Sequence, residues 1–173
     1  MSRHSWKILA AIVCLLSTAA SAETLVTQIR EWEFGFSTEK EEAGQVIYYS
    51  ASIKSYTTPR VRLVIRCNAL TGFARIYLEG MTDPKVKGDF VVTFAMDGQL
   101  PKQVLAHNEN DIVQFGSTSS YNPAEGKSSI LTAASMAEKL ELITEKGSAS
   151  FQTSGGLDII DKLVHSCTDF SLF

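Results

Sequence analysis

The side chains with the clearest chemical potential in this chain are four arginines that lie close together. Arg60, Arg62 and Arg66 share the parity of one predicted strand, and therefore its outer face. Arg75 lies on the next predicted strand and extends the same basic patch. Because a guanidinium group binds carboxylate and phosphate in bidentate fashion, the patch predicts contact with an acidic protein, lipid A phosphates or peptidoglycan carboxylates. The alternative is a solvated strand face with ordinary cross-strand ion pairs.

Two other patterns suggest a metal or phosphate site. His107, Glu109 and Asp111 alternate across a turn and have side chains that can bind a divalent ion, but acidic turn residues are more often simply solvated. Residues 126–128 (Gly-Lys-Ser) match the end of a phosphate-binding loop, yet Tyr121 stands where the signature requires glycine. We therefore predict no metal and no cofactor.

Local catalytic motifs are absent from the sequence. It contains neither a G-x-S-x-G elbow nor an H-E-x-x-H pair. A dispersed Ser-His-Asp site is defined by geometry, so sequence spacing does not reveal it. We predict that the protein is not an enzyme, and a hydrolase with a dispersed site stays open as an alternative.

The first 22 residues have the three parts of a secretory signal. Arg3 and Lys7 form a positive segment, residues 8–16 are apolar throughout, and Ala20-Ser21-Ala22 offers small side chains for cleavage. The apolar run is shorter than the roughly 20 residues of a membrane-spanning helix. We expect cleavage after Ala22, one domain over residues 23–173 with no transmembrane segment, and a periplasmic location, with secretion as the second choice.

Cleavage would leave two cysteines, Cys67 and Cys167. In an oxidising compartment such a pair predicts a disulfide, and neither cysteine has C-x-x-C or metal-ligand spacing. Cys67 shares a predicted strand face with Val61, Leu63 and Ile65, so it should point into the core.

Composition and charge also limit the function. The chain is 45% hydrophobic and 20% charged, as expected for an ordinary globular domain. Its formal net charge of −3 excludes the strongly basic composition that general nucleic-acid binding requires.

Short apolar alternations predict a mainly β fold, either an antiparallel β-sandwich or a curled sheet, with a C-terminal α-helix packed on it. Asp97-Gly98 predicts a type I′ turn. Residues 38–45 and 116–129 are predicted as loops, and Ser129 as the cap of a short helix over 130–137. We expect about eight strands, drawn from nine candidate segments: 32–37, 46–53, 60–67, 73–79, 90–96, 103–107, 111–115, 139–145 and 148–153.

The last predicted helix brings the two cysteines together. Over 157–167, an apolar stripe with helical spacing ends at Cys167 and consists of Leu157, Ile160, Leu163, Val164 and Cys167. Because the stripe should face the sheet, Cys167 should reach the inward-facing Cys67.

Several of these segments resemble the VasI-like proteins, small exported proteins associated with type VI secretion loci. They are the run Leu63–Cys67, the run Phe73–Tyr77, the F-x-x-x-G-G-L stretch Phe151–Leu157, and a helix ending in Cys167. The layout is also similar to that of the invasion-associated locus B proteins. The resemblance covers roughly residues 32–167 and implies an envelope accessory protein without catalytic residues.

We therefore predict an exported accessory or binding protein of the Gram-negative envelope that contacts an envelope protein or an anionic envelope component. The link to type VI secretion is implied by the resemblance alone. One alternative is an inhibitor or immunity-type protein that blocks a cell-wall hydrolase through a protruding loop such as 116–129. The other is the hydrolase with a dispersed site.

Overall fold

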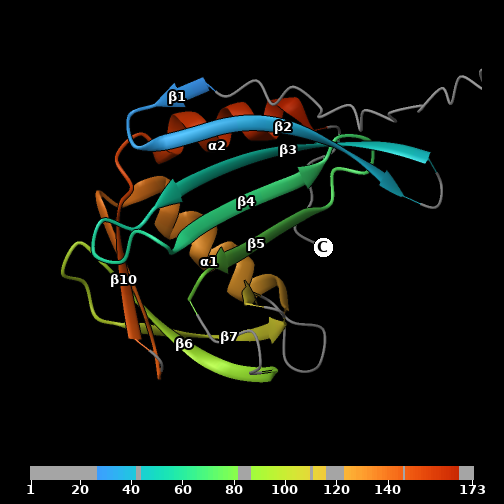
Figure 1. The fold of residues 1–173 in the computed structure, drawn as a ribbon. Coiled ribbons are helices and arrows are strands. Elements are labelled where there is room, and N and C mark those ends of the chain that lie inside the picture. Colours follow the sequence, from blue (N-terminus) through green and yellow to red (C-terminus); the bar gives the residue numbers. More distant parts are fainter. Residues whose placement is uncertain are drawn as a thin grey trace, which may run out of the picture.

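The computed structural model describes residues 27–41, 44–81, 87–109, 111–115, 123–145 and 147–167. The predicted signal peptide at residues 1–22 lies outside these residues. Within them the chain forms one ten-stranded antiparallel sheet and two helices, which confirms the mainly β class (Figure 1). Neither helix is long and apolar enough to cross a bilayer.

The strands account for most of the described chain. Their bounds are β1 Thr27–Ile29, β2 Trp32–Glu41, β3 Gly44–Lys54, β4 Arg62–Asn68, β5 Ala74–Glu79, β6 Gly88–Met96, β7 Lys102–Glu109, β8 Ile112–Phe115, β9 Lys139–Thr144 and β10 Gly147–Gln152. The helices are α1, Pro123–Met136, and α2, Gly156–Ser166.

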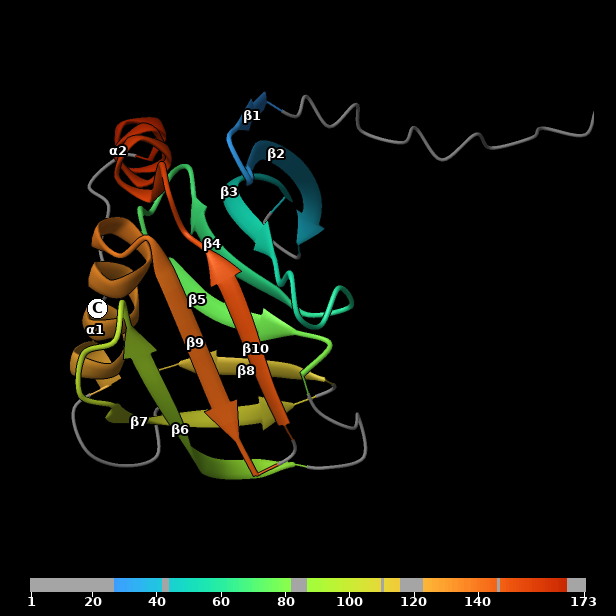
Figure 2. The same ribbon diagram turned by 90° about the vertical axis from the view of Figure 1, so that its left-hand side faces the viewer.

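One continuous sheet, rather than the two sheets of a sandwich, forms the body of the molecule. Its strand order is β1-β2-β3-β4-β5-β8-β7-β6-β9-β10. The sheet curls until β10 meets the turn after β3, where Tyr56 N donates to Ser150 O at 3.0 Å and Ser150 N donates to Thr57 Oγ1 at 2.9 Å. Figure 2 shows the helices along one side of this curl, with β9 and β10 crossing beside them.

Alternate residues of the strands point into a single core, as the two-residue period of a strand requires. On β4 these are Leu63, Ile65 and Cys67, each with no exposed surface. Trp32 at the start of β2 is also fully buried, and its Nε1 donates to the carbonyl oxygen of Thr153 at 3.3 Å. Burial of an indole needs such a partner for its N–H group, so this bond joins β2 to the segment before α2.

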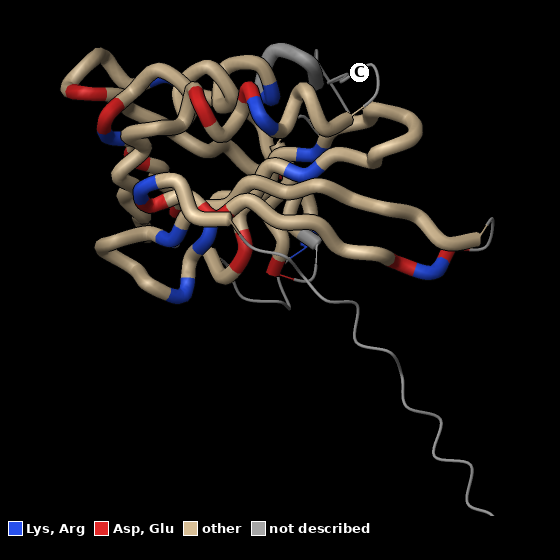
Figure 3. Tube along the Cα trace, turned by 90° about the horizontal axis from the view of Figure 1, so that it is seen from above, with Lys and Arg blue, Asp and Glu red and all other residues tan. Residues whose placement is uncertain are grey.

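The predicted loop at 38–45 is wrong. β2 continues to Glu41 and β3 begins at Gly44, so the charged residues belong to a long hairpin. Thr38 pairs with Ile47 and Lys40 with Gln45. The hairpin projects from the body of the molecule, with charges of both signs near its end (Figure 3). Its outer part is polar because it extends beyond the core, which removes the apolar alternation that marks a strand in sequence.

The predicted end of the loop at residue 129 and the predicted start of the helix at residue 130 are also wrong. Helix α1 begins at Pro123, so residues 123–129 are helical and Ser129 does not cap the helix. Proline is favoured at the first helical position because its missing N–H group has no helical partner there. The remaining part of the predicted loop, 116–122, lies outside the described residues.

Helix α2 packs on the sheet as predicted, but its buried face is rotated relative to the predicted apolar stripe. Ile159, Ile160 and Leu163 are buried, whereas Leu157 is 64% exposed and Val164 is 37% exposed. The helix begins at Gly156, close to the backbone of Ala134 on α1. The Asp97-Gly98 turn is confirmed, because both residues have positive φ, 43° and 74°.

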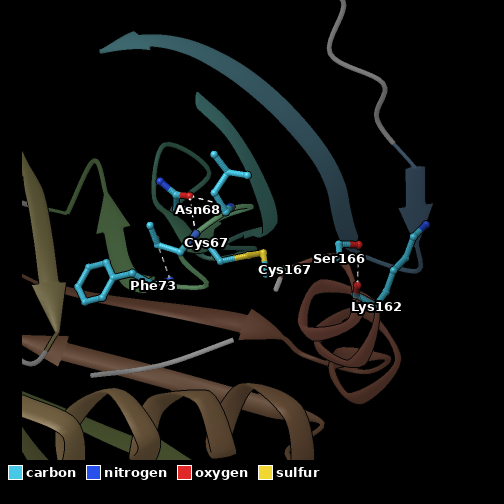
Figure 4. Close-up of a disulfide and its surroundings, with 8 residues drawn as sticks. Cys67, Asn68, Phe73, Lys162, Ser166 and Cys167 are labelled. Carbon is cyan, nitrogen blue, oxygen red and sulfur yellow. Dashed lines mark hydrogen bonds between the residues drawn. A yellow bond between two sulfur atoms is a disulfide. The ribbon is translucent and has the colours of Figure 1, made fainter. Parts of the chain in front are cut away.

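The disulfide between Cys67 and Cys167 is present (Figure 4). Cys67 lies on the core side of β4, and Cys167 directly follows α2, with 6.5 Å between their Cα atoms. Both residues are buried. The bridge closes a loop of 100 residues and joins the terminal helix to the middle of the sheet.

Candidate binding groove on the outer face of the sheet

A groove of about 500 Å³ lies on the outer face of the sheet. Its walls come from β2, β3, β4, β5, β7 and β8, together with the turn between β4 and β5. A smaller hollow of about 170 Å³ shares Arg66 and Tyr77 with it and continues along β4 toward Arg62. The face that the sequence predicted to be basic therefore contains the concave surface.

Arg62 is engaged in a cross-strand network at the end of this face. Its Nη2 donates to Glu33 Oε2 at 2.7 Å and to Ser52 Oγ at 2.6 Å. Lys54 Nζ lies 3.7 Å from the other oxygen of the Glu33 carboxylate. Arg62 is therefore already paired with a carboxylate, as the solvated-face alternative predicted.

Arg66 is held by the projecting hairpin. Its Nη2 lies 2.5 Å from Glu39 Oε1, and its guanidinium carbon lies 3.8 Å from the centre of the Tyr48 ring. The Tyr48 hydroxyl donates to the carboxylate of Glu41. This hydrogen bond is the main cause of a raised Tyr48 pKa, with a smaller contribution from burial. The end of the hairpin thus bends over the outer face and supplies one wall of the groove.

Arg75 has a different environment. It lies directly opposite Arg66 in the β4–β5 register, yet no carboxylate of the described residues is within ion-pair distance of it. Its guanidinium carbon lies 6.0 Å from the centre of the Phe73 ring. Lys127 Nζ approaches the same ring at 4.8 Å. Two cations therefore meet one aromatic ring at the side of the groove.

Lys127 is one of the residues in this region that the sequence interpretation did not assign to the basic patch. It belongs to the Gly-Lys-Ser segment that was considered as a phosphate loop, but it lies on α1 and is only 5% exposed. Burial lowers its pKa, and the positive charge of Arg75 lowers it further. The approach of Lys127 to the Phe73 ring depends on how α1 packs against β5, so sequence spacing does not reveal it.

Arg60 lies outside the groove. It is exposed in the turn before β4, two residues ahead of the strand. Its carbonyl oxygen would lie 2.4 Å from a Cβ atom at position 80, which explains glycine there, where φ is +70°. The structure therefore places Arg62, Arg66 and Arg75 on one face and separates Arg60 from them.

A row of polar residues crosses the centre of the face. Tyr77, Gln114, His107 and Asp89 are in register on β5, β8, β7 and β6. His107 Nδ1 lies 2.7 Å from Asp89 Oδ1. Burial raises the Tyr77 pKa, Glu79 raises it further, and Arg66 opposes both effects.

The side chains that line the groove can bind a ligand through charged groups and aromatic rings. Among the described residues, no three His, Cys, Asp or Glu side chains are grouped as metal ligands. Of the metal pattern considered in the sequence, His107 bonds Asp89 instead, and the side chain of Glu109 lies outside the described part of the chain.

Comparison with models of protein families, with curated proteins and with solved structures gives no match for this chain. The resemblance to the VasI-like proteins therefore stays a prediction based on short motifs.

Proposed function

We propose that the protein is an exported binding or accessory module of the Gram-negative cell envelope and that it binds its partner through the groove on the outer face of the sheet. Its link to type VI secretion is proposed from the sequence resemblance alone. A disulfide between a core strand and the terminal helix suits a protein that works in an oxidising compartment.

The observation that carries this proposal is Arg75. Its guanidinium group lines the groove, and no described carboxylate neutralises it. Arg62 and Arg66 are paired with Glu33 and Glu39, and Arg60 lies outside the groove, so Arg75 is the described arginine of the predicted patch that can accept an anionic group there. The groove volume lies within the usual range of ligand sites, 300–1,000 Å³.

The inhibitor alternative has less support. The loop suggested for it was 116–129, but residues 123–129 are helical. Lys127, in this segment, is buried.

Capture from a periplasmic extract tests the proposed function. The immobilised protein should retain an envelope component, identified by mass spectrometry, and Arg75→Glu should abolish this capture. Arg60→Glu is the matched control, because it makes the same charge change outside the groove and should leave capture intact. Equal capture by both variants, or capture of a cell-wall hydrolase that survives Arg75→Glu, would contradict the proposal.

One observation favours the hydrolase alternative, namely the contact between His107 and Asp89. A carboxylate that bonds Nδ1 of a histidine orients the ring as a general base, and His107 also lines the groove. The test is release of soluble fragments from peptidoglycan by the purified protein. This alternative predicts that His107→Gln abolishes release while His165→Gln, a change on the exposed face of α2, leaves it unchanged. No release by the unmodified protein would eliminate it.

A further inference from the structure

Among the described residues that line the groove, Glu41 and Arg75 lack a partner of opposite charge, and they come from different strands. Glu41, near the end of the hairpin, accepts a hydrogen bond from Tyr48, but no cation of the described residues lies within ion-pair distance of it. Arg75 on β5 likewise has no carboxylate partner within the described chain. Both side chains line the same cavity.

Of the other described groove residues, Arg66 and His107 each contact a carboxylate. Arg66 lies against Glu39, and His107 lies against Asp89. These pairs leave Glu41 and Arg75 as the groups that gain most from a charged ligand. A polyanion would meet Glu39 and Glu41, and a polycation would meet Arg75, so each would be repelled at one wall.

The surface between the two charges suits a peptide. The side-chain amide of Gln114 has no hydrogen-bond partner among the described residues, and it can both donate to and accept from a peptide group. The rings of Phe73 and Tyr77 offer apolar contact beside it. The volume of about 500 Å³ limits the ligand to a few residues.

We propose that the groove binds a short peptide carrying both a free ammonium and a free carboxylate group, with the ammonium at Glu41, the carboxylate at Arg75 and the peptide groups at Gln114. This inference rests on the proposed function, since it takes the same groove as the binding surface. It deepens that proposal by replacing a general anionic partner with a zwitterionic one.

The test uses three forms of one peptide: tetra-alanine with free termini, its N-acetylated form and its C-amidated form. Binding to the purified protein, with the disulfide intact, is followed by amide chemical shifts and calorimetry. The free peptide should shift the resonances of Tyr77 and Gln114. Each blocked form should bind at least about tenfold more weakly, because it loses one charge-assisted contact.

Two variants assign the charges to their residues. Arg75→Gln should remove the discrimination against the amidated peptide and keep the discrimination against the acetylated one. Glu41→Gln should do the reverse. Arg60→Gln, outside the groove, should keep both, and dispersed amide spectra should verify the fold of each variant.

Equal binding of the three peptides would overturn the inference. So would an absence of binding, or displacement of the free peptide by inorganic phosphate at equal concentration. If envelope capture is still lost in Arg75→Glu while the peptides do not discriminate, the zwitterionic ligand is wrong and the proposed function stands. If capture is unaffected by Arg75→Glu, the proposed function itself fails.

Discussion

Arg66 and Arg75 lie directly opposite each other on β4 and β5, but only Arg66 has a carboxylate partner among the described residues. Like charges at opposed positions of an antiparallel pair destabilise a sheet by roughly 0.2–1 kcal/mol. Glu39 relieves this repulsion at Arg66 and leaves Arg75 as an uncompensated cation at the groove. A ligand carboxylate at Arg75 would complete the charge balance of the pair.

This relationship predicts opposite effects of two matched substitutions on stability. Arg75→Gln should raise the free energy of unfolding by about 0.5 kcal/mol at low ionic strength, because it removes the repulsion from Arg66. Arg66→Gln should lower it by about 1 kcal/mol, because the contacts with Glu39 and the Tyr48 ring are lost. Urea unfolding at low and high salt measures both, and the gain in Arg75→Gln should shrink as salt screens the charges. A loss of stability in Arg75→Gln would show that this side chain has a structural role.

The disulfide should contribute most of its stabilisation by restricting the unfolded chain. For a loop of 100 residues the chain-entropy estimate is about 4–5 kcal/mol, an upper value for a real bridge. The double variant Cys67→Ser with Cys167→Ser should therefore unfold at a much lower guanidinium concentration. In the oxidised protein neither thiol should react with a maleimide before reduction, and reaction of both under native conditions would refute the bridge.

The parts of the fold that could be predicted from sequence are the strands whose side chains alternate between the core and the outer face. The predicted segment 60–67 agrees with β4 because Leu63, Ile65 and Cys67 are buried. The same parity predicted the side of the sheet on which Cys67 lies, and the helical period predicted that Cys167 would reach it. The buried residues of α2 differ in part from the predicted stripe, and the close approach of Gly156 to α1 is a contact that sequence spacing does not report.

The groove was only partly predictable. The arginines were found because their type and parity are visible in the sequence. Glu39 and Lys127, which set Arg66 and Arg75 apart, lie in the segments 38–45 and 116–129 that were predicted as loops. Polar residues that project beyond the core have no hydrophobic period, so Glu39 gave no signal of its contact with Arg66.

Ionisation of Tyr77 should make the protein less stable at alkaline pH. Its pKa in the folded state is raised above 10.0, mainly by burial and then by Glu79. Above pH 10 the unfolded chain therefore loses this proton before the folded protein does, and stability falls as pH rises. Tyr77→Phe should reduce this loss, measured by urea unfolding from pH 9 to about 11. The exposed Tyr56→Phe is the control, and an equal effect of both variants would contradict the assignment to Tyr77.

Gly156 should tolerate no larger side chain, because α2 begins against the backbone of α1. A Cβ atom at this position would lie 1.9 Å from the carbonyl oxygen of Ala134, a backbone atom that rotamer changes do not move. Gly156→Ala should therefore lower the free energy of unfolding by about 1–3 kcal/mol through overpacking, even though alanine is a better helix former than glycine. Leu157→Ala is the control on the same helical turn. Since Leu157 is 64% exposed, that change should stay within about 0.5 kcal/mol. Chemical unfolding of both variants decides the matter, and a Gly156→Ala protein as stable as the parent would show that the helices do not meet this closely.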